Sequence, residues 1–106
     1  MKLPIVLIGP MGVGKTTIGK KLAKTLELPF IDTDAVITTS YGSPSDIFQT
    51  QGEMAFRAIE EQVVTEAITT DSVIATGGGA VLSGNTQRKL KQCTVVYLST
   101  DGKRIK

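Results

Sequence analysis

The feature that most constrains this chain is the stretch GPMGVGKTT at residues 9–17, which directly follows an apolar run at residues 5–8. The apolar run has the length and composition of a buried strand, whereas the residues after it contribute little to packing. The stretch fills the pattern GxxxxGK(S/T) with Gly9, Gly14, Lys15 and Thr16. A glycine-rich turn between a strand and a helix, ending in a lysine and a hydroxyl residue, predicts phosphate binding.

Each residue type in this loop has a chemical reason to be there. Small residues let backbone N–H groups surround a phosphate, and Gly12 allows a close approach that a Cβ atom would obstruct. The ammonium group of Lys15 would neutralise β- and γ-phosphate oxygens, and the Thr16 hydroxyl would bind Mg²⁺. The alternative is a flexible glycine turn, but the complete pattern between a strand and a helix rarely arises by chance.

Strands and helices are expected to alternate along the chain. Apolar runs predict strands at residues 5–8, 30–31, 72–75 and 94–98. Helical spacing predicts helices at residues 15–26, 34–40, 52–69 and 86–92, with a short helical turn capped by Ser45. Such alternation implies parallel strands joined by right-handed crossovers, hence an α/β fold of three layers with ligands at the carboxyl ends of the strands. We expect residues 1–106 to form a single domain.

Composition excludes several classes of function. The net charge is +2, and the chain has neither an arginine-rich run nor more than five aromatic residues, so we expect no nucleic-acid partner. No stretch is long and apolar enough to predict a membrane partner or a signal peptide.

Histidine is absent, so acid or base chemistry must use Asp, Glu, Lys or Tyr. The single Cys93 cannot form an internal disulfide, which favours a cytoplasmic protein and a small buried side chain.

Two aspartates follow the second predicted strand in the sequence FIDTD. Asp32 and Asp34 are one residue apart, so in an extended chain their side chains would point to the same side. They could act together at a metal or a substrate. Asp34 could equally cap the next helix, and these five residues alone do not decide between the two interpretations.

Two further motifs are ambiguous when taken singly. In GEMAFRAIE, the spacing of Glu53, Arg57 and Glu60 places the three charges on one face of a helix, which surface ion pairing would also explain. In TGGGA, the glycines at residues 77–79 could form a turn or could let a small ligand lie against bare backbone.

Together and in this order, the four motifs resemble those of the shikimate kinase family. The phosphate loop, DxD after the second strand, GExxFRxxE on the next long helix and GGG after the third strand extend the resemblance over residues 5–98. It implies the three-layer α/β/α P-loop NTPase fold with strand order 2-3-1-4. It also implies ATP-dependent phosphorylation of the shikimate 3-hydroxyl in the aromatic amino-acid pathway, with ATP and shikimate as partners and Mg²⁺ as cofactor.

The resemblance implies a role for each matched residue. ATP would be held by Gly12, Val13, Gly14, Lys15, Thr16 and Thr17. Thr16 would ligate magnesium, supported through water by Asp32. Asp34 would bind the shikimate hydroxyls and help take up a proton, so that Asp34 and Lys15 are the expected catalytic residues.

The remaining implied roles concern substrate binding. Arg57 would bind the substrate carboxylate, while Gly78 and Gly79 would lie along the ring. Glu53 and Glu60 are expected to orient the guanidinium of Arg57 rather than to touch substrate.

The chain departs from the family pattern after Leu98, where only residues 99–106 follow. The family continues into a lid with a catalytic arginine, a second substrate arginine, an adenine-contacting segment and a last strand. We therefore expect the fifth strand to be absent and Arg104 to be a solvated tail charge. The edge of the strand at residues 94–98 would then be exposed and could promote self-association.

Two functional hypotheses remain open. The chain could be a short shikimate kinase that still phosphorylates, or an inactive remnant that binds nucleotide and phosphate and needs its missing C-terminal part. Another small-molecule kinase with the same phosphate loop is disfavoured, because the DxD, FR and GGG elements all match one substrate family.

Overall fold

The computed structural model describes residues 3–9, 14–77, 84–98 and 104–105 of the 106 residues in the chain. Among these residues, no helix combines the length and the apolar character needed to cross a lipid bilayer.

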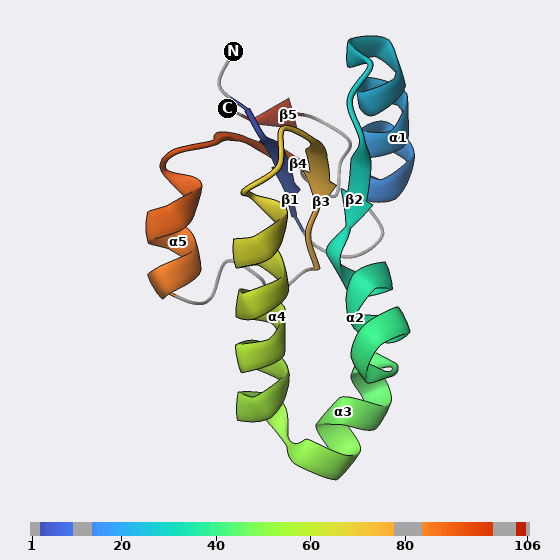
Figure 1. Cartoon of the computed structure of the whole chain (residues 1–106), viewed down its shortest axis with the longest axis vertical. Helices are drawn as coiled ribbons and strands as arrows, with labels where there is room; N and C mark the ends of the chain where they lie inside the picture. The colour runs from blue at the N-terminus through green and yellow to red at the C-terminus, as the bar shows by residue number, and fades with distance from the viewer. Residues whose placement is uncertain (1–2, 10–13, 78–83, 99–103, 106) are drawn as a thin grey trace.

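Four parallel strands form the centre of the molecule (Figure 1). They are arranged in the order β2 (Phe30–Asp32), β3 (Val73–Ala75), β1 (Ile5–Ile8) and β4 (Thr94–Leu98). Ile5 lies opposite Val73 on one side and Thr94 on the other, and Phe30 also lies opposite Val73. The expected parallel order 2-3-1-4 is therefore confirmed.

The outer edge of β4 differs in part from the expectation. The two-residue strand β5 (Arg104–Ile105) pairs with it antiparallel, with Tyr97 opposite Ile105 and Leu98 opposite Arg104. The backbone of Arg104 therefore belongs to the sheet rather than to a solvated tail. The short antiparallel pair satisfies backbone groups that an edge strand would otherwise leave open. Within the described residues, Val95 and Val96 still have no strand partner on that edge.

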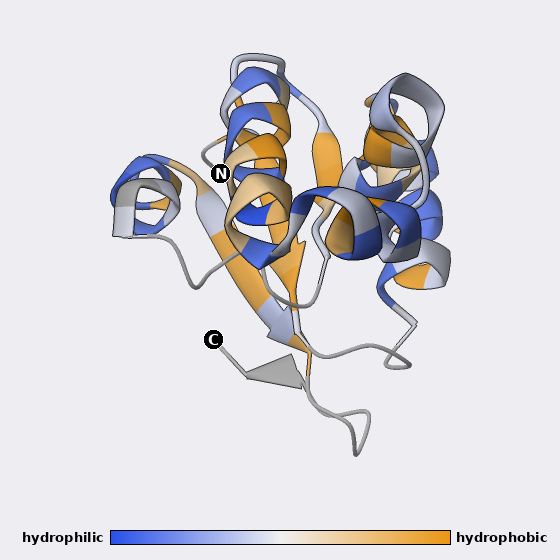
Figure 2. Ribbon diagram, turned by 90° about the horizontal axis from the view of Figure 1, so that it is seen from below, coloured by the Kyte–Doolittle hydropathy of each residue, from blue (hydrophilic) through white to orange (hydrophobic). Residues whose placement is uncertain are grey.

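Helices cover both faces of the sheet. Helix α1 (Lys15–Leu26) lies on one face, and α4 (Glu53–Ala67) and α5 (Gly84–Leu90) lie on the other (Figure 1). Alternation along the strands sends Leu7 toward α1, where it packs with Ala23, while Val6 packs with Ala67 on the opposite face. The strands are accordingly strongly hydrophobic along the ribbon, whereas the helices beside them carry both hydrophobic and hydrophilic residues (Figure 2). The three-layer α/β architecture is confirmed.

Two helices extend beyond the sheet and connect β2 to α4. These are α2 (Thr33–Tyr41) and α3 (Pro44–Gln51), which lie past the end of β2 (Figure 1). Ile37 of α2 and Ile47 of α3 are almost completely buried against α4, in a small core of their own. This second core fixes the position of the α2–α3 segment relative to α4.

The start of α3 corrects one expectation. The cap is Ser43, whose Oγ accepts a hydrogen bond of 3.2 Å from the Asp46 N–H, and not Ser45. Pro44 occupies the first helical position, where its fixed φ and missing N–H favour helix initiation. The segment is consequently a helix of eight residues rather than a single turn.

Helix α5 begins and ends two residues earlier than the expected range of 86–92. After Leu90, the N–H groups of Lys91, Gln92 and Cys93 donate to carbonyls three residues back, which is the tighter pattern that ends many helices. Cys93 itself is half-buried, and burial raises the pKa of its thiol, in agreement with the expected unreactive side chain.

Candidate active site

The phosphate loop leads into α1 at the carboxyl end of β1. Gly14 precedes the helix with a φ of 81°, in the left-handed region that favours glycine. The first turn of α1 contains no acidic side chain, and no side-chain hydrogen bond caps the helix at Gly14. A helix N-terminus of this kind suits an anion. Gly12 and Val13, which we expected to bind ATP, lie outside the described residues.

Lys15 extends back over the loop. Its Nζ donates a hydrogen bond of 2.6 Å to the Gly9 carbonyl, at the opposite end of the loop. Desolvation lowers the pKa of Lys15, although the nearby carboxylates of Asp34 and Asp32 act in the opposite direction. The ammonium group therefore lies close to both aspartates of the DxD sequence. Thr17, the last predicted ATP ligand, is exposed on the first turn of α1.

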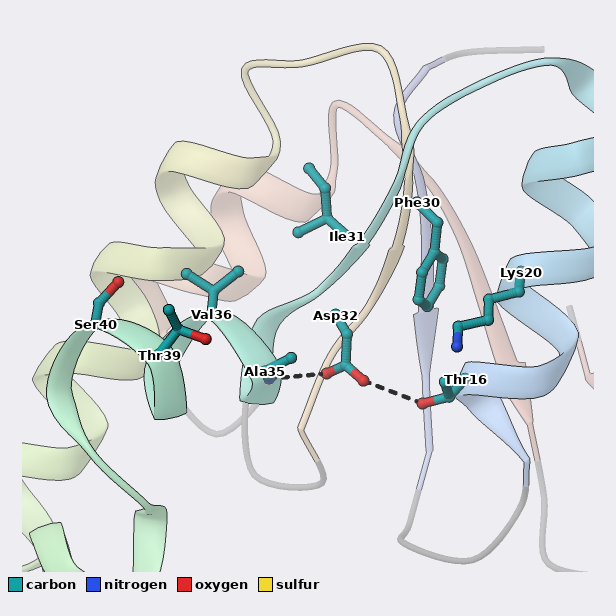
Figure 3. A pocket seen from close by; sticks show the side chains of 9 residues that line it. All are labelled: Thr16, Lys20, Phe30, Ile31, Asp32, Ala35, Val36, Thr39 and Ser40. Carbon is teal, nitrogen blue, oxygen red and sulfur yellow. Dashed lines mark hydrogen bonds between the residues drawn. The ribbon is translucent and has the colours of Figure 1, made fainter.

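The two aspartates occupy different structural positions. Asp32 ends β2 and caps α2: its Oδ1 accepts hydrogen bonds from the N–H groups of Asp34, at 3.0 Å, and Ala35, at 3.3 Å. Its Oδ2 accepts a hydrogen bond of 3.1 Å from the Thr16 hydroxyl (Figure 3). The cap is therefore Asp32, which removes the interpretation of Asp34 as a helix cap. The chain is also not extended through Asp34, because α2 begins at Thr33.

Asp34 faces the first glycine of the GGG sequence. A Cβ atom built on Gly77 would lie 2.5 Å from Asp34 Oδ1 and 3.1 Å from Glu60 Oε2. A side chain at position 77 would therefore require one of the two carboxyl groups or the backbone to shift. Gly78 and Gly79, the two glycines we expected along the substrate ring, lie outside the described residues.

Arg57 is held on one side of α4 by carboxylates and aromatic rings. Its Nη1 donates to Glu60 Oε1 at 3.1 Å, and its Nη2 lies 3.5 Å from Glu53 Oε2. The guanidinium carbon lies 5.9 Å from the ring centre of Phe48 and 5.6 Å from that of Phe56. Both separations are in the range of cation–π attraction. The expected alignment of Glu53, Arg57 and Glu60 on one helical face is confirmed.

Burial changes the ionisation of the two carboxyl groups next to Gly77. Burial raises the pKa of Asp34, the charge of Asp32 raises it further, and Lys15 lowers it. Burial also raises the pKa of Glu60, while its hydrogen bond and charge interaction with Arg57 lower it and Asp34 adds a smaller increase. Two carboxyl groups with raised pKa values beside a lysine of lowered pKa form an electrostatically unusual cluster, which is typical of functional sites.

The structure therefore brings together the described residues that the sequence singled out. The Thr16 hydroxyl donates to Asp32, and the charge of Lys15 interacts with those of Asp32 and Asp34. Asp34 and Glu60 both face Gly77, and Glu60 accepts from Arg57. Sequence reasoning did not single out Phe48 or Thr33, because an aromatic residue on a short helix and a threonine between two aspartates carry no motif signal.

A pocket of about 540 Å³ opens at the other side of Asp32, along the edge of β2 (Figure 3). Its lining residues are Thr16, Lys20, Phe30, Ile31, Asp32, Ala35, Val36, Thr39 and Ser40. Asp34, Arg57 and Gly77 are not among them, so this pocket adjoins the Thr16–Asp32 pair but is distinct from the surface around Arg57.

Comparison with known proteins gives a consistent result. The family model described as shikimate kinase matches residues 11–106. A shikimate kinase of Rhodococcus erythropolis is 50% identical over 100 residues, which are 92% of this chain and 59% of that protein. The crystal structure of a shikimate kinase from Bacteroides thetaiotaomicron superposes with a TM-score of 0.87 at 35% identity, over 92% of this chain and 57% of that one.

A third relative is a shikimate kinase from Acinetobacter baumannii, solved in complex with shikimate. It superposes with a TM-score of 0.80 at 40% identity, over 90% of this chain and 54% of that one. The chain thus spans somewhat more than half the length of the relatives it matches. The strand order, the phosphate loop and the cluster around Gly77 agree with a family match that covers most of the sequence, and on this evidence the chain belongs to the shikimate kinase family.

Proposed function

We propose that this chain contributes to the ATP-dependent phosphorylation of a shikimate hydroxyl, the reaction named by its relatives. The observation that carries the proposal is the cluster in which Asp34 and Glu60 both face Gly77, Glu60 accepts from Arg57, and the charge of Lys15 interacts with that of Asp34. A phosphate-binding group at one end and a guanidinium at the other suit a substrate that has both a hydroxyl group to be phosphorylated and a carboxylate. A relative of the same family binds shikimate in its crystal structure, which supports this choice of acid.

Arg57 is the residue that we assign to the substrate carboxylate. The guanidinium has five N–H donors in a fixed plane, and Glu60 accepts from only one of its terminal nitrogens. The second ion pair, with Glu53, involves a carboxylate that is 66% exposed, so it is weak and can yield to an incoming carboxylate. Phe48 and Phe56 restrict the plane of the guanidinium, which favours a single binding direction.

Asp34 is the residue that we assign to the attacking hydroxyl. Its carboxylate would accept a hydrogen bond from that hydroxyl and take up the proton as the oxygen bonds to the γ-phosphorus of ATP, while the bond from that phosphorus to ADP breaks and ADP leaves. The raised pKa of Asp34 brings its proton affinity closer to that required of a general base at neutral pH. Lys15 would neutralise charge on the transferred phosphoryl group, and little covalent help is needed beyond this positioning.

Thr16 in the first turn of α1 and Asp32 at the end of β2 fit a magnesium ion. The Thr16 hydroxyl and the Asp32 carboxylate lie 3.1 Å apart, and hard oxygen donors of this kind, with phosphate oxygens, are what Mg²⁺ prefers. Thr16 would be a direct ligand and Asp32 would act through water. A magnesium ion held there would reduce the negative charge that develops during transfer.

A place in aromatic amino-acid biosynthesis and a cytoplasmic location belong to the same proposal. Both follow from the reaction, because ATP is a cytoplasmic co-substrate and shikimate is a precursor of aromatic compounds. The alternative proposal is a nucleotide- and phosphate-binding chain that turns over nothing alone.

The deciding experiment measures ADP release with ATP, Mg²⁺ and shikimate. The chain is assayed alone and with a separate fragment that corresponds to the remaining length of a relative. Turnover by the chain alone supports the kinase, whereas ATP binding with turnover only after the fragment is added, or with no turnover at all, supports the alternative. Absence of ATP·Mg²⁺ binding at millimolar concentration contradicts both.

Variants of two lysines on α1 make the binding measurement specific. Lys15→Ala is expected to abolish ATP binding, because it removes the ammonium group from the loop. Lys24→Ala is the matched control, since Lys24 is exposed in the last turn of the same helix. An equal loss in both variants would contradict the role of Lys15.

A further inference from the structure

Thr33, the residue between the two aspartates, has a completely buried side chain at 0% exposure. Its Oγ1 lies 3.4 Å from the carbonyl oxygen of Ala75, to which it donates, and 3.3 Å from the N–H of Gly77, from which it accepts. These two hydrogen bonds therefore link the start of α2 to the end of β3. The hydroxyl group meets the backbone on both sides of Thr76, where the chain leaves the sheet.

Gly77 is the point to which this link leads. Its backbone lies against the carboxyl groups of Asp34 and Glu60, and Glu60 in turn accepts from Arg57. Asp34 directly follows Thr33 in the sequence. One side chain thus ties the segment that carries Asp34 to the glycine against which Asp34 is placed.

We propose that Thr33 is a positioning residue, which fixes the separation between the Asp34 carboxylate and Gly77 and so sets the affinity for the hydroxy-acid substrate. This inference rests on the proposed function for the identity of the substrate. Because its side chain is completely buried, we expect Thr33 to act through Gly77 and Asp34 and not by touching substrate or nucleotide.

If Thr33 had a purely structural role, its hydrogen bonds would only hold neighbouring elements of the fold together. Thr76 provides that comparison, because its side chain is almost equally buried at 3% exposure and its Oγ1 donates to the Leu7 carbonyl at 3.0 Å. The Thr76 hydroxyl links β3 to β1 and has no contact with the Gly77 N–H. A loss of stability alone is therefore expected from Thr76→Val.

The test compares Thr33→Val, Thr33→Ser and Thr76→Val with the unmodified chain. Valine keeps the shape of threonine but removes the acceptor for Gly77, so Thr33→Val is expected to weaken shikimate binding about tenfold, the size of one lost buried hydrogen bond. Its affinity for ATP·Mg²⁺ should stay within about twofold. Thr33→Ser should restore shikimate binding, and Thr76→Val should leave both affinities within about twofold.

Calorimetric titration gives the two dissociation constants, and thermal unfolding confirms that each variant is folded. If Thr33→Val does not fold, Thr33→Ala replaces it. Equal weakening of shikimate and ATP, or equal effects of Thr33→Val and Thr76→Val on shikimate, would overturn the inference.

A second measurement separates this inference from the proposed function. If the unmodified chain binds no shikimate, the proposed substrate is wrong, and the positioning role is then decided by amide hydrogen exchange at Gly77. Faster exchange at Gly77 in Thr33→Val, but not in Thr33→Ser or Thr76→Val, supports it. Unchanged exchange in Thr33→Val overturns it.

Discussion

The hydroxyl of Thr16 donates a hydrogen bond of 3.1 Å to Oδ2 of Asp32, which joins the first turn of α1 to the end of β2. The other oxygen of the same carboxylate caps α2 by accepting from the N–H groups of Asp34 and Ala35. One side chain therefore holds the beginnings of two helices, and its charge lies where we propose the magnesium ion.

These two roles of Asp32 can be separated by substitution. Asn is as good a helix cap as Asp, so Asp32→Asn is expected to keep most of the stability while weakening Mg²⁺-dependent ATP binding. Asp32→Ala should weaken the same binding and also lower the free energy of unfolding by about 1 kcal/mol, the usual cost of a lost N-cap. Urea unfolding and titration with ATP at several Mg²⁺ concentrations measure the two effects. Equal stability of the two variants would argue against the capping role.

Removal of the Arg57 side chain should weaken the binding of one proposed substrate, shikimate, and not that of the other, ATP. Arg57→Ala is expected to weaken shikimate binding by at least tenfold and to leave ATP binding unchanged, because the guanidinium is on α4 and the nucleotide loop is at α1. Arg88→Ala is the control, since Arg88 is exposed on α5. Calorimetric titration with each ligand gives the comparison. If Arg57→Ala weakens both ligands equally, the residue is structural.

A methyl group at Gly77 should displace the carboxylate of Asp34. Gly77→Ala places a Cβ atom 2.5 Å from Asp34 Oδ1, so the carboxyl group must move or the turn must shift. Crowding of this kind costs about 1–3 kcal/mol of stability, and we expect shikimate affinity to fall with it. Gly84→Ala is the matched control, because a Cβ atom there meets nothing within 4 Å. Similar stabilities of the two variants would contradict the close approach described for Gly77.

The Asp34 carboxyl group should make stability depend on pH. Burial raises its pKa in the folded chain above the value in the unfolded chain, so the folded chain binds more protons between these two values. Stability consequently falls as pH rises through that window. Asp34→Asn cannot ionise, so its gain in unfolding free energy over the unmodified chain should grow as pH rises above the ordinary carboxyl pKa of 3.8, and level off once the folded-state carboxyl group has ionised.

Chemical denaturation of both chains at a series of pH values measures this difference. Asp71→Asn controls for the general effect of removing a negative charge, because Asp71 is exposed in the turn before β3. A constant difference between Asp34→Asn and the unmodified chain at all pH values would contradict the burial of Asp34.

Self-association through the edge of β4 remains a prediction. Within the described part of the chain, β5 covers only Tyr97 and Leu98, and Val96 beside them has no strand partner on that edge. We expect sedimentation velocity to detect dimers at high protein concentration. Tyr97→Lys, which adds a charge to an exposed edge position, should shift the equilibrium to monomer. A single monomeric species for the unmodified chain at every concentration would contradict this route of association.

The fold was largely predictable because its signals are local. Four short apolar runs and helical spacing are sufficient to place the strands and most helices, and the phosphate loop fixes one strand-to-helix junction. The boundaries were less predictable. Ser43 and Pro44 together begin α3; the sequence SPS offers two serines, and the preference of proline for the first helical position is the local signal that favours Ser43 over Ser45.

The candidate site was predictable only in part. The spacing of Glu53, Arg57 and Glu60 predicted that they share one face of α4, because residues three or four apart are neighbours on the surface of a helix. The contact of Phe48 with Arg57 depends on how α3 packs against α4, and the contact of Thr33 with Gly77 spans 44 residues of sequence. No local pattern encodes either contact, because each depends on two elements that meet only after folding.

Gly9 has a φ of 144°, and a Cβ atom placed on it would overlap the carbonyl oxygen of Leu98. Gly9, at the start of the phosphate loop, therefore packs directly against the main chain of Leu98, the last residue of β4. For anyone redesigning this scaffold, position 9 tolerates no side chain, and a graft that alters the end of β4 is expected to disturb Gly9 through this contact.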